Sequence, residues 1–324
     1  MSGVDRHEST SRGGAASNVA PGPAEGDHGP DPRPFPAPGS PVNRRRLFFL
    51  LLAALTAALA AVSSCAHMEN YSAATAPVTR WAPDRPPPPA PDTLRVVTFN
   101  IQFSERVDAA LTELRTDPDL RDPDILLLQE MEGGDVRRLA RELGLHAAYI
   151  PASHHSKHDE DFGNAVLSRW PLTDVRGVDL PNRQPWNGQR RMAVLATAQL
   201  PDGPLHCVSV HLEVPTLGTR KRVEQLQAVA DAVAERPGPV VLGGDFNCIL
   251  DRDAQLLGRV LRRAGFREAH GQGPTARRGL ILWKFQEGVL DRVFGRGLAP
   301  AAAGAPPSTA ASDHLPVWSR WTRP

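Results

Sequence analysis

The hydrophobic pattern of the chain changes near residue 92. From there to residue 324, short apolar runs recur with turn residues between them, and a few longer stretches place apolar residues at helical spacing. The short runs predict strands, at 94–99, 125–128, 147–150, 164–168, 192–200, 205–212, 240–242 and 290–294. The longer stretches predict helices, over 107–114, 136–143, 220–234 and 254–264. Sheets packed on each other and covered outside by helices are therefore expected over 92–324.

One predicted strand leads directly into groups that can carry chemistry. The apolar run 240–242 is followed by Gly243 and Gly244, and then by Asp245 and Asn247. Side chains two residues apart on an extended chain point to the same face, and an oxygen-only pair suits a hard cation such as Mg²⁺. A strand followed by an Asx turn explains the same residues. The rest of the chain has to decide between these two interpretations.

The chain before residue 92 has a different composition. The protein has 324 residues, a formal charge of +1 and 32 prolines, many of them in the first 91 residues. The near-neutral charge gives no global basic field for nucleic acid, although a local patch would suffice. Residues 1–43 are rich in Gly, Pro, Ser and Ala without an apolar period, which predicts a disordered N-terminal extension.

Residues 44–65 are typical of an export signal. Three arginines at 44–46 precede an apolar run at 47–62, which is short for a membrane span and suits a signal-peptide core. The arginines also resemble a twin-arginine signal, and the run ends at Cys65 in a sequence that resembles a bacterial lipobox. A lipidated Cys65 predicts a protein anchored in the cell envelope. The alternatives are an uncleaved anchor helix and cleavage near Ala60 without lipid.

The segment 66–91 is predicted to be a stiff Pro-rich tether that holds the domain off the membrane. The run 154–161 contains three histidines and three acids, which favours a solvated loop over a metal site, and 179–189 is predicted to be an exposed loop. Several basic side chains are expected either to line a site or to be solvated: Arg190, Arg220, Lys221, Arg222, Arg277 and Arg278. Trp186 is a candidate to stack on a base or to pack on a lipid. The two later cysteines are predicted to be buried and not disulfide-bonded.

Polar groups recur where the predicted strands end. They are Asn100, Glu130, His211, Asp245, Asn247, Asp291, Asp313 and His314. Because a buried strand end is a poor place for an unpaired charge, convergence of these groups would form a cage of carboxylates and amides with two imidazoles.

Seven short segments carry a resemblance to a known group of enzymes. They are Thr98–Ile101, Leu128–Glu130, Gly163–Arg169, Val210–Leu212, Gly243–Asn247, Leu290–Val293 and Ser312–Pro316. In this order the chain resembles the endonuclease/exonuclease/phosphatase superfamily, which includes pancreatic-type deoxyribonucleases, apurinic endonucleases, neutral sphingomyelinases and inositol polyphosphate 5-phosphatases. The resemblance implies an α/β fold, a four-layer sandwich of two packed mixed β-sheets flanked by helices, with the site at one edge of the sheets.

The resemblance also implies roles for individual residues. Glu130, Asn100 and Asp313 would ligate Mg²⁺, with Mn²⁺ as an alternative. Asp245 and Asn247 would hold phosphate and orient the attacking water or a second metal. His314, positioned by Asp291, would act as acid or base, and His211 would donate to a phosphate oxygen. Arg191 and Asn164 would bind substrate. The carboxylate partner that many family nucleases give the His211-type residue cannot be assigned from the sequence.

These residue types suit phosphoester hydrolysis, which needs an in-line water, neutralisation of charge on oxygen and a group that moves protons near neutral pH. We therefore predict an exported, metal-dependent, nuclease-like phosphodiesterase that is a monomer. A phospholipid phosphodiesterase of the sphingomyelinase type and a small-molecule phosphatase are alternatives. A binding lipoprotein that has lost turnover is a second alternative.

Overall fold

The computed structural model describes Phe48 and residues 68–155, 159–185, 187–215, 218–269, 273–280 and 283–324, with backbone alone for 277–280 and 283–287. Apart from Phe48, the predictions made for 1–65 lie outside the described residues and stay predictions. In the described part of the chain, no helix is both long and apolar enough to cross a membrane.

Two mixed sheets form the centre of the domain. The first contains β1 (Glu69–Asn70), β2 (Thr79–Trp81), β3 (Thr93–Asn100), β4 (Ile125–Met131), β5 (His146–His155), β6 (Glu160–Ser168), β15 (Ala299–Gly304) and β16 (Val317–Thr322). Its order is β1-β5-β6-β4-β3-β16-β15, and β2 also pairs with β5. The second contains β7 (Leu172–Asp179), β8 (Met192–Leu200), β9 (Gly203–His211), β10 (Val240–Asp245), β11 (Arg267–Glu268) and β14 (Asp291–Arg296), in the order β11-β14-β10-β9-β8-β7. A separate hairpin joins β12 (Ala276–Leu280) to β13 (Trp283–Gly288).

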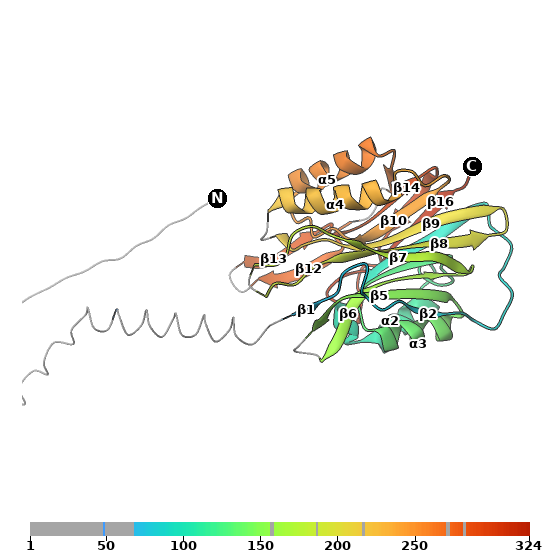
Figure 1. Cartoon of the computed structure of the whole chain (residues 1–324), viewed down its shortest axis with the longest axis horizontal. Helices are drawn as coiled ribbons and strands as arrows, with labels where there is room; N and C mark the ends of the chain where they lie inside the picture. The colour runs from blue at the N-terminus through green and yellow to red at the C-terminus, as the bar shows by residue number, and fades with distance from the viewer. Residues whose placement is uncertain are drawn as a thin grey trace, which may run out of the picture. The chain divides into compact units, whose positions relative to one another are not determined.

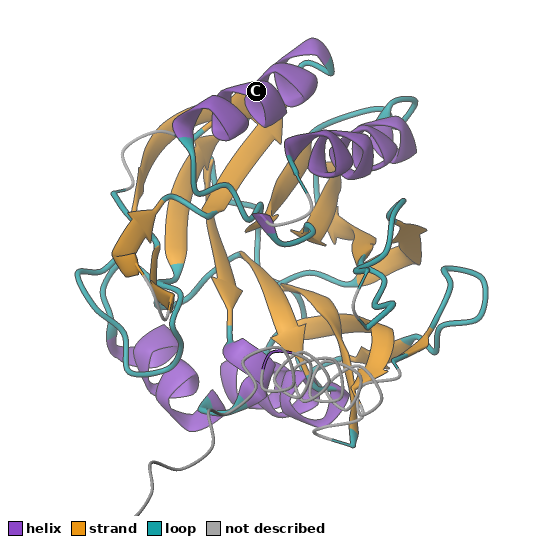
Figure 2. Ribbon diagram, turned by 90° about the vertical axis from the view of Figure 1, so that its left-hand side faces the viewer, coloured by secondary structure: helices purple, strands orange, loops and turns teal. Residues whose placement is uncertain are grey.

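Helices cover the outer faces of both sheets. α2 (Val107–Thr116) and α3 (Gly133–Leu143) lie on the first sheet, and α4 (Thr219–Val233) and α5 (Asp251–Arg263) lie on the second (Figure 1). Figure 2 shows the helices at the top and bottom of the molecule with the strands between them. The predicted four-layer α/β sandwich is confirmed.

The alternation of side chains along β3 shows why these sequences form layers. Leu94 and Val96 point into the core cluster between the sheets, while Val97 and Phe99 point into the cluster beneath α2 and α3. A third cluster lies between the second sheet and α4 and α5. Because successive strand residues face opposite sides, a strand covered on both faces carries apolar residues at adjacent positions, as β3 does at Val96 and Val97.

The segment predicted to be a free tether is instead part of the fold. β1 pairs with the end of β5 and β2 with its beginning, so residues 69–81 run along the edge of the first sheet. The Trp170 indole then donates to the Pro88 carbonyl at 3.0 Å, and Arg85 donates to the Gly144 carbonyl at 2.6 Å. The proline run therefore crosses the end of the domain that leads into β3. This pairing contradicts the interpretation of the segment as a spacer. The sequence did not predict the pairing, because backbone hydrogen bonds to an open sheet edge leave no hydrophobic period in the sequence.

Two smaller predictions need correction, and several strands were missed. The run 154–161 is not only a solvated loop, since its two ends pair as the last residues of β5 and the first of β6, with 156–158 outside the described residues. The stretch 179–189 is not simply exposed, because Leu180, Gln184 and Gln189 are buried. The sequence did not predict eight of the strands, namely β1, β2, β7, β11, β12, β13, β15 and β16. Cys207 and Cys248 are buried and free, as expected.

Gly244 adopts a backbone conformation that fixes the approach of two strands. Its φ is 154°, and a Cβ added there would lie 1.7 Å from the Val210 carbonyl oxygen of β9. The glycine therefore allows β10 to pair closely with β9 one residue before Asp245.

We expect Gly244→Ala to lower the free energy of unfolding by at least about 3 kcal/mol, because the methyl group can fit only if the strands separate. Denaturant unfolding would measure this loss. Gly134→Ala, where a Cβ meets open space near the start of α3, is the matched control and should change stability by less than about 1 kcal/mol. Equal stabilities for the two variants would contradict the account.

Candidate active site

Three neighbouring strands of the second sheet bring three polar side chains into one row. β9 and β10 are parallel, and their register pairs His211 with Asp245. β14 is antiparallel to β10, and its register pairs Asp291 with Asp245. His211 and Asp245 therefore lie at the same end of two parallel strands. Each of the three residues is at least 97% buried.

The first sheet supplies Asn100 and Glu130 at the same end of the sandwich. Asn100 is the last residue of β3 and pairs with Gln129 of β4. The register of β4 against β6 shifts between Leu128 and Met131, and Glu130 has a φ of 58°. A bulge with a left-handed non-glycine residue is a strained local arrangement that re-aims a side chain. Here the bulge turns the Glu130 carboxylate toward the second sheet.

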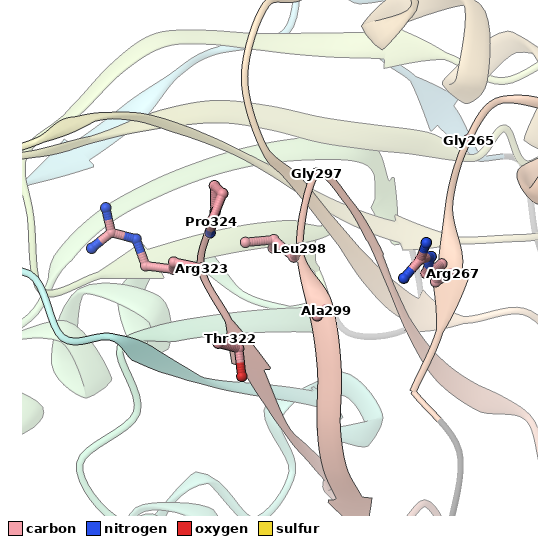
Figure 3. A pocket seen from close by; sticks show the side chains of 8 residues that line it. All are labelled: Gly265, Arg267, Gly297, Leu298, Ala299, Thr322, Arg323 and Pro324. Atoms are coloured by element: carbon pink, nitrogen blue, oxygen red, sulfur yellow. The ribbon is translucent and has the colours of Figure 1, made fainter.

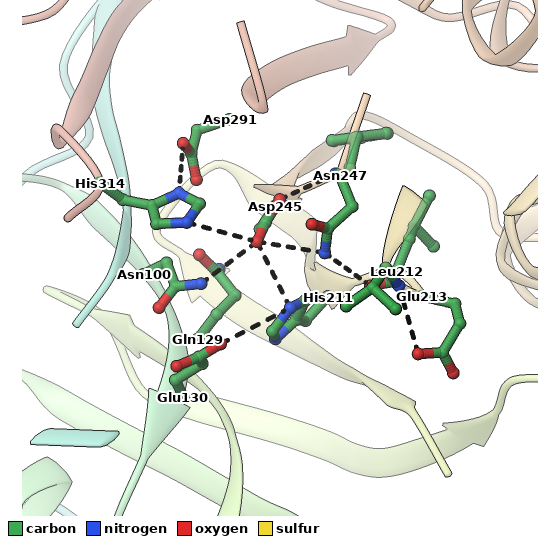
Figure 4. Close-up of polar contacts among 12 residues, drawn as sticks. Asn100, Gln129, Glu130, His211, Leu212, Glu213, Asp245, Asn247, Asp291 and His314 are labelled. Carbon is green, nitrogen blue, oxygen red and sulfur yellow. Dashed lines mark hydrogen bonds and ion pairs between the residues drawn. The ribbon is translucent and has the colours of Figure 1, made fainter. Parts of the chain in front are cut away.

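The side chains converge on one carboxylate oxygen, Oδ2 of Asp245 (Figure 4). The distances from this atom are 3.2 Å to Asn100 Nδ2, 3.3 Å to Asn247 Nδ2, 3.3 Å to His211 Nε2 and 3.8 Å to His314 Nε2. Its second oxygen, Oδ1, accepts from the Asn247 backbone N–H at 2.8 Å. A carboxylate that is fully buried requires such compensation.

His211 is held between a guanidinium and two carboxylates. Arg191 Nη1 lies 3.1 Å from His211 Nδ1, and His211 Nε2 lies 3.3 Å from Asp245 and 3.8 Å from Glu130. Because a guanidinium can only donate, Nδ1 accepts and the ring proton is on Nε2. The carboxylates that the sequence could not assign to this histidine are therefore Asp245 and Glu130, both on its Nε2 side.

His314 forms a close pair with Asp291. Its Nδ1 lies 2.8 Å from Asp291 Oδ2, so the carboxylate fixes the ring and leaves Nε2 facing Asp245. Burial alone would lower the pKa of His314, but the charges of Asp291 and Asp245 outweigh it and raise the pKa to about 10. Neutralising Asp245 would move this pKa back toward the range in which imidazole exchanges protons.

The oxygens of the site fit a divalent cation. Burial raises the pKa of the Glu130 carboxyl, and Asp245 adds to the rise, while Arg191 and His314 oppose it. Asp245, Asp291 and His314 each offer a ligand atom, and these atoms lie within 4.8 Å of one another. Asn247 is fully buried, and its Oδ1 has no hydrogen-bond partner among the described residues. Buried anionic oxygens and an amide acceptor without a donor are what a hard cation would satisfy.

Comparison with known proteins agrees with this geometry. The sequence model of the Endonuclease/Exonuclease/phosphatase family matches residues 97–314. The chain belongs to this family.

One curated relative and two solved structures show what the chain is similar to, and the names of the two structures state different ligands or substrates. The chain is 31% identical over 235 residues to a UPF0294 protein of Vibrio cholerae, covering 70% of this chain and 77% of that protein. A structure of D. rerio TDP2 complexed with a single-strand DNA product has a TM-score of 0.57 at 18% identity, covering 71% and 98% of the two chains. A Bacteroides thetaiotaomicron mannosyl-6-phosphatase has a TM-score of 0.51 at 15% identity, covering 70% and 98%. At these identities the two structures show a shared fold alone.

Within this family fold, three predicted residues are placed differently from the rest. Asn100 accepts from the Gln102 backbone N–H through Oδ1, so the atom that would ligate a cation faces away from the carboxylates. Asp313 is half-buried and contacts the Ser312 hydroxyl, and its charge contributes to the raised pKa of His314. Asn164 donates to the Met192 carbonyl at 2.8 Å and thereby joins β6 to β8 next to Arg191. Their predicted roles in binding metal or substrate stay predictions.

Several supporting residues gave no sequence signal. Gln129 donates to the Ser209 hydroxyl at 2.9 Å, and Ser209 donates to the Leu128 carbonyl, so the two sheets are linked just below the site. The hydroxyl of buried Thr275 accepts from the backbone N–H of Asp291 at 2.9 Å. Glu213 lies 3.9 Å from Arg191. Isolated polar residues are common in strands and loops, so their supporting role becomes visible only when the structure shows their hydrogen-bond or ion-pair partners.

The basic residues require one clear correction. Arg222, predicted to be solvated or to line the site, is fully buried and pairs with Asp253 at 2.8 Å, which ties α4 to α5. Arg220 is exposed and pairs with Glu224. Trp186 and the side chains of Arg277 and Arg278 lie outside what the structure describes.

A cavity lies at the end of the sandwich away from Asp245. It has a volume of about 320 Å³ and is lined by Gly265, Arg267, Gly297, Leu298, Ala299, Thr322, Arg323 and Pro324 (Figure 3). None of these residues has a carboxylate or imidazole side chain, and the lining follows the ends of β14 and β16 that point away from Asp245. This cavity is separate from the candidate active site.

We expect Asp291→Asn to lower the pKa of His314 in the metal-free protein by more than one unit, because the nearest charge that raises it is removed. NMR titration of the ring would measure the change. Asp313→Asn is the matched control, since the charge of Asp313 raises the pKa of His314 less than the charges of Asp291 and Asp245 do, and its effect should be smaller. An equal or larger effect of Asp313→Asn would contradict the assignment.

Proposed function

We propose that the protein is an exported, Mg²⁺-dependent phosphodiesterase of the nuclease-like type, with Mn²⁺ as an alternative cofactor. The observation that carries the proposal is the convergence of Glu130, His211 and His314 on the buried carboxylate of Asp245. Membership of the endonuclease/exonuclease/phosphatase family supports phosphoester hydrolysis as the reaction class.

The protein side chains would divide the work as follows. Glu130, Asp245 and Asn247 would hold the cation, which when bound neutralises charge on the phosphate oxygens. Asn100 donates from Nδ2 to Asp245, and its hydrogen bond to Glu130 opposes the rise that burial causes in the pKa of that carboxyl. Asp313, half-buried beside His314, is the remaining candidate ligand from the sequence.

Binding and proton transfer fall to the basic groups. Arg191 would bind a phosphate oxygen and keeps the His211 proton on Nε2, from which His211 would donate to a second oxygen. His314 would move the proton of the attacking water or of the leaving oxygen at Nε2, while Asp291 holds its Nδ1. Burial of the site keeps competing water away from these groups.

Two aromatic residues beside the site, Phe103 and Phe162, favour an extended, base-containing substrate. Phe162 lies 6.4 Å from the His211 ring and 5.8 Å from the Arg191 guanidinium, and half-exposed Phe103 lies 4.9 Å from Phe162. Phe162 is buried, at 5% exposed, so the half-exposed Phe103 is the ring suited to stack on a base. TDP2 in the solved structure holds single-strand DNA. A small-molecule phosphatase is the second candidate, because a structural neighbour is a mannosyl-6-phosphatase.

We also propose that Cys65 is lipidated after export, so that the protein is a monomeric lipoprotein of the cell envelope. The support is the arginine-rich start, the apolar run 47–62 and the lipobox-like end at Cys65.

We expect Glu130→Gln and His314→Ala each to lower Mg²⁺-stimulated kcat by about 100-fold or more, since each removes a charge or proton carrier at the reacting atoms. The assay would compare single-strand DNA, plasmid DNA, sphingomyelin and a chromogenic phosphodiester, with Mg²⁺ and with EDTA. His146→Ala and Glu142→Gln, at the other end of the fold, are matched controls and should keep full activity. Full activity in both site variants would refute the proposal, and Mg²⁺ binding without any hydrolysis would favour a binding lipoprotein.

A further inference from the structure

The first described residues after Cys65 are attached to the active-site end of the domain. Glu69 and Asn70 pair with His154 and Ser153, the last part of β5. Figure 1 shows β1 at the same end of the sandwich as the β12–β13 hairpin, opposite the C-terminus. That hairpin is joined to the site, because Ala276 forms a bridge with His314. The chain therefore enters the fold beside the candidate active site.

Asn70 makes the joint specific. Its Oδ1 accepts from the Arg190 backbone N–H at 2.7 Å, and its Nδ2 donates to the Gly188 carbonyl at 3.0 Å. Arg190 is followed directly by Arg191, which contacts His211. Asn70 is thus hydrogen-bonded to the residue directly before Arg191, a side chain of the candidate active site.

Two further contacts hold the entering segment along the same rim. The Tyr71 hydroxyl donates to Asp161 at 3.0 Å, and the Ala73 backbone N–H donates to Asp179 at 2.9 Å. Met68 is 5% exposed. Residues 68–73, called the entry segment below, are therefore fixed on the domain over their whole length.

Chain length then limits how far Cys65 lies from the site. Two residues, Ala66 and His67, lie between Cys65 and Met68, so the chain makes three steps from one to the other. A fully extended chain spans at most about 3.6 Å per step, so the limit is about 11 Å. β9 alone, which runs from the far end to His211, is roughly 30 Å long for its nine residues. An anchor at Cys65 is thus confined to one end of the domain.

We propose that the entry segment turns the active-site end of the domain toward the lipid bilayer in which Cys65 is anchored, so that this end docks at the bilayer surface. The proposal rests on the lipidation of Cys65 proposed above. The sequence alone predicted that the 26 residues 66–91 form a tether that does not pack on the domain. Such a tether would let the site face any direction. The docked segment removes that freedom, and phosphoesters at the bilayer surface become the ones nearest to the site.

The test uses the full-length lipidated protein in vesicles and measures distance to the bilayer by energy transfer to headgroup-labelled lipids. Fluorophores are placed through Arg252→Cys and Arg263→Cys, exposed positions at the two ends of α5. These positions are up to about 16 Å apart along the helix axis. Cys207 and Cys248 are buried and should not react. We expect stronger transfer from position 252, which follows the site strand β10, than from position 263.

Two insertions test whether the entry segment sets the orientation. A Gly-Ser spacer of about 12 residues, with an end-to-end distance of about 20 Å, is inserted between Ala66 and His67 in one variant and between Pro77 and Val78 in the other. The first spacer releases the anchor from the entry segment and should abolish the difference between the two labels. The second lies beyond the entry segment and should leave the difference intact.

Several results would overturn the proposal. They are equal or stronger transfer from position 263 at native spacing, loss of the difference with the spacer at 77–78, and persistence of the difference with the spacer at 66–67. Vesicle association that survives Cys65→Ser would overturn it as well. Hydrolysis of a soluble chromogenic phosphodiester by the same variants tests the proposed function separately, because it does not depend on orientation.

Discussion

The burial of the Asp245 carboxylate is the constraint on which the rest of the site depends. A fully buried charge is stable only when hydrogen bonds and opposite charges surround it. Asn100, Asn247, His211 and His314 meet this need from four segments that are far apart in the sequence. Burial lowers the pKa of His314, but Asp291 and, after it, Asp245 outweigh burial and raise this pKa. A divalent cation is the further partner that three neighbouring carboxylates at this site would favour.

At the candidate active site, the two packed sheets bring the ends of several strands together. The strand register places His211, Asp245 and Asp291 in one row of the second sheet. The bulge in the first sheet turns the Glu130 carboxylate toward this row. Gly244 permits the close strand approach that sets this row. The Gln129–Ser209 hydrogen bond then fixes one sheet relative to the other directly beneath the site. Strain and polar burial are thus concentrated where the chemistry would occur.

Sequence patterns were sufficient to predict the layers and most of the strand-end residues that meet around Asp245. Apolar runs such as 125–128 are long enough to indicate strands buried on both faces, and acids or imidazoles that follow them mark one sheet edge. The entry segment and the burial of Arg222 could not be predicted, because both depend on partners distant in sequence: the edge of β5 and Asp253. The position of Asn70 beside Arg190 has the same cause. Backbone pairing and single buried ion pairs leave no periodic trace in a sequence.

The central claim is that Asp245 and its neighbours form a cation site for phosphoester hydrolysis. Anomalous diffraction from crystals soaked in Mn²⁺ would test it most directly, because the peak position does not depend on knowing the substrate. The account predicts a peak at about 2–2.5 Å from carboxylate oxygens of Asp245 and Glu130. A peak confined to the acidic and histidine residues at the tip of β5 and β6, or no peak near Asp245, would contradict it.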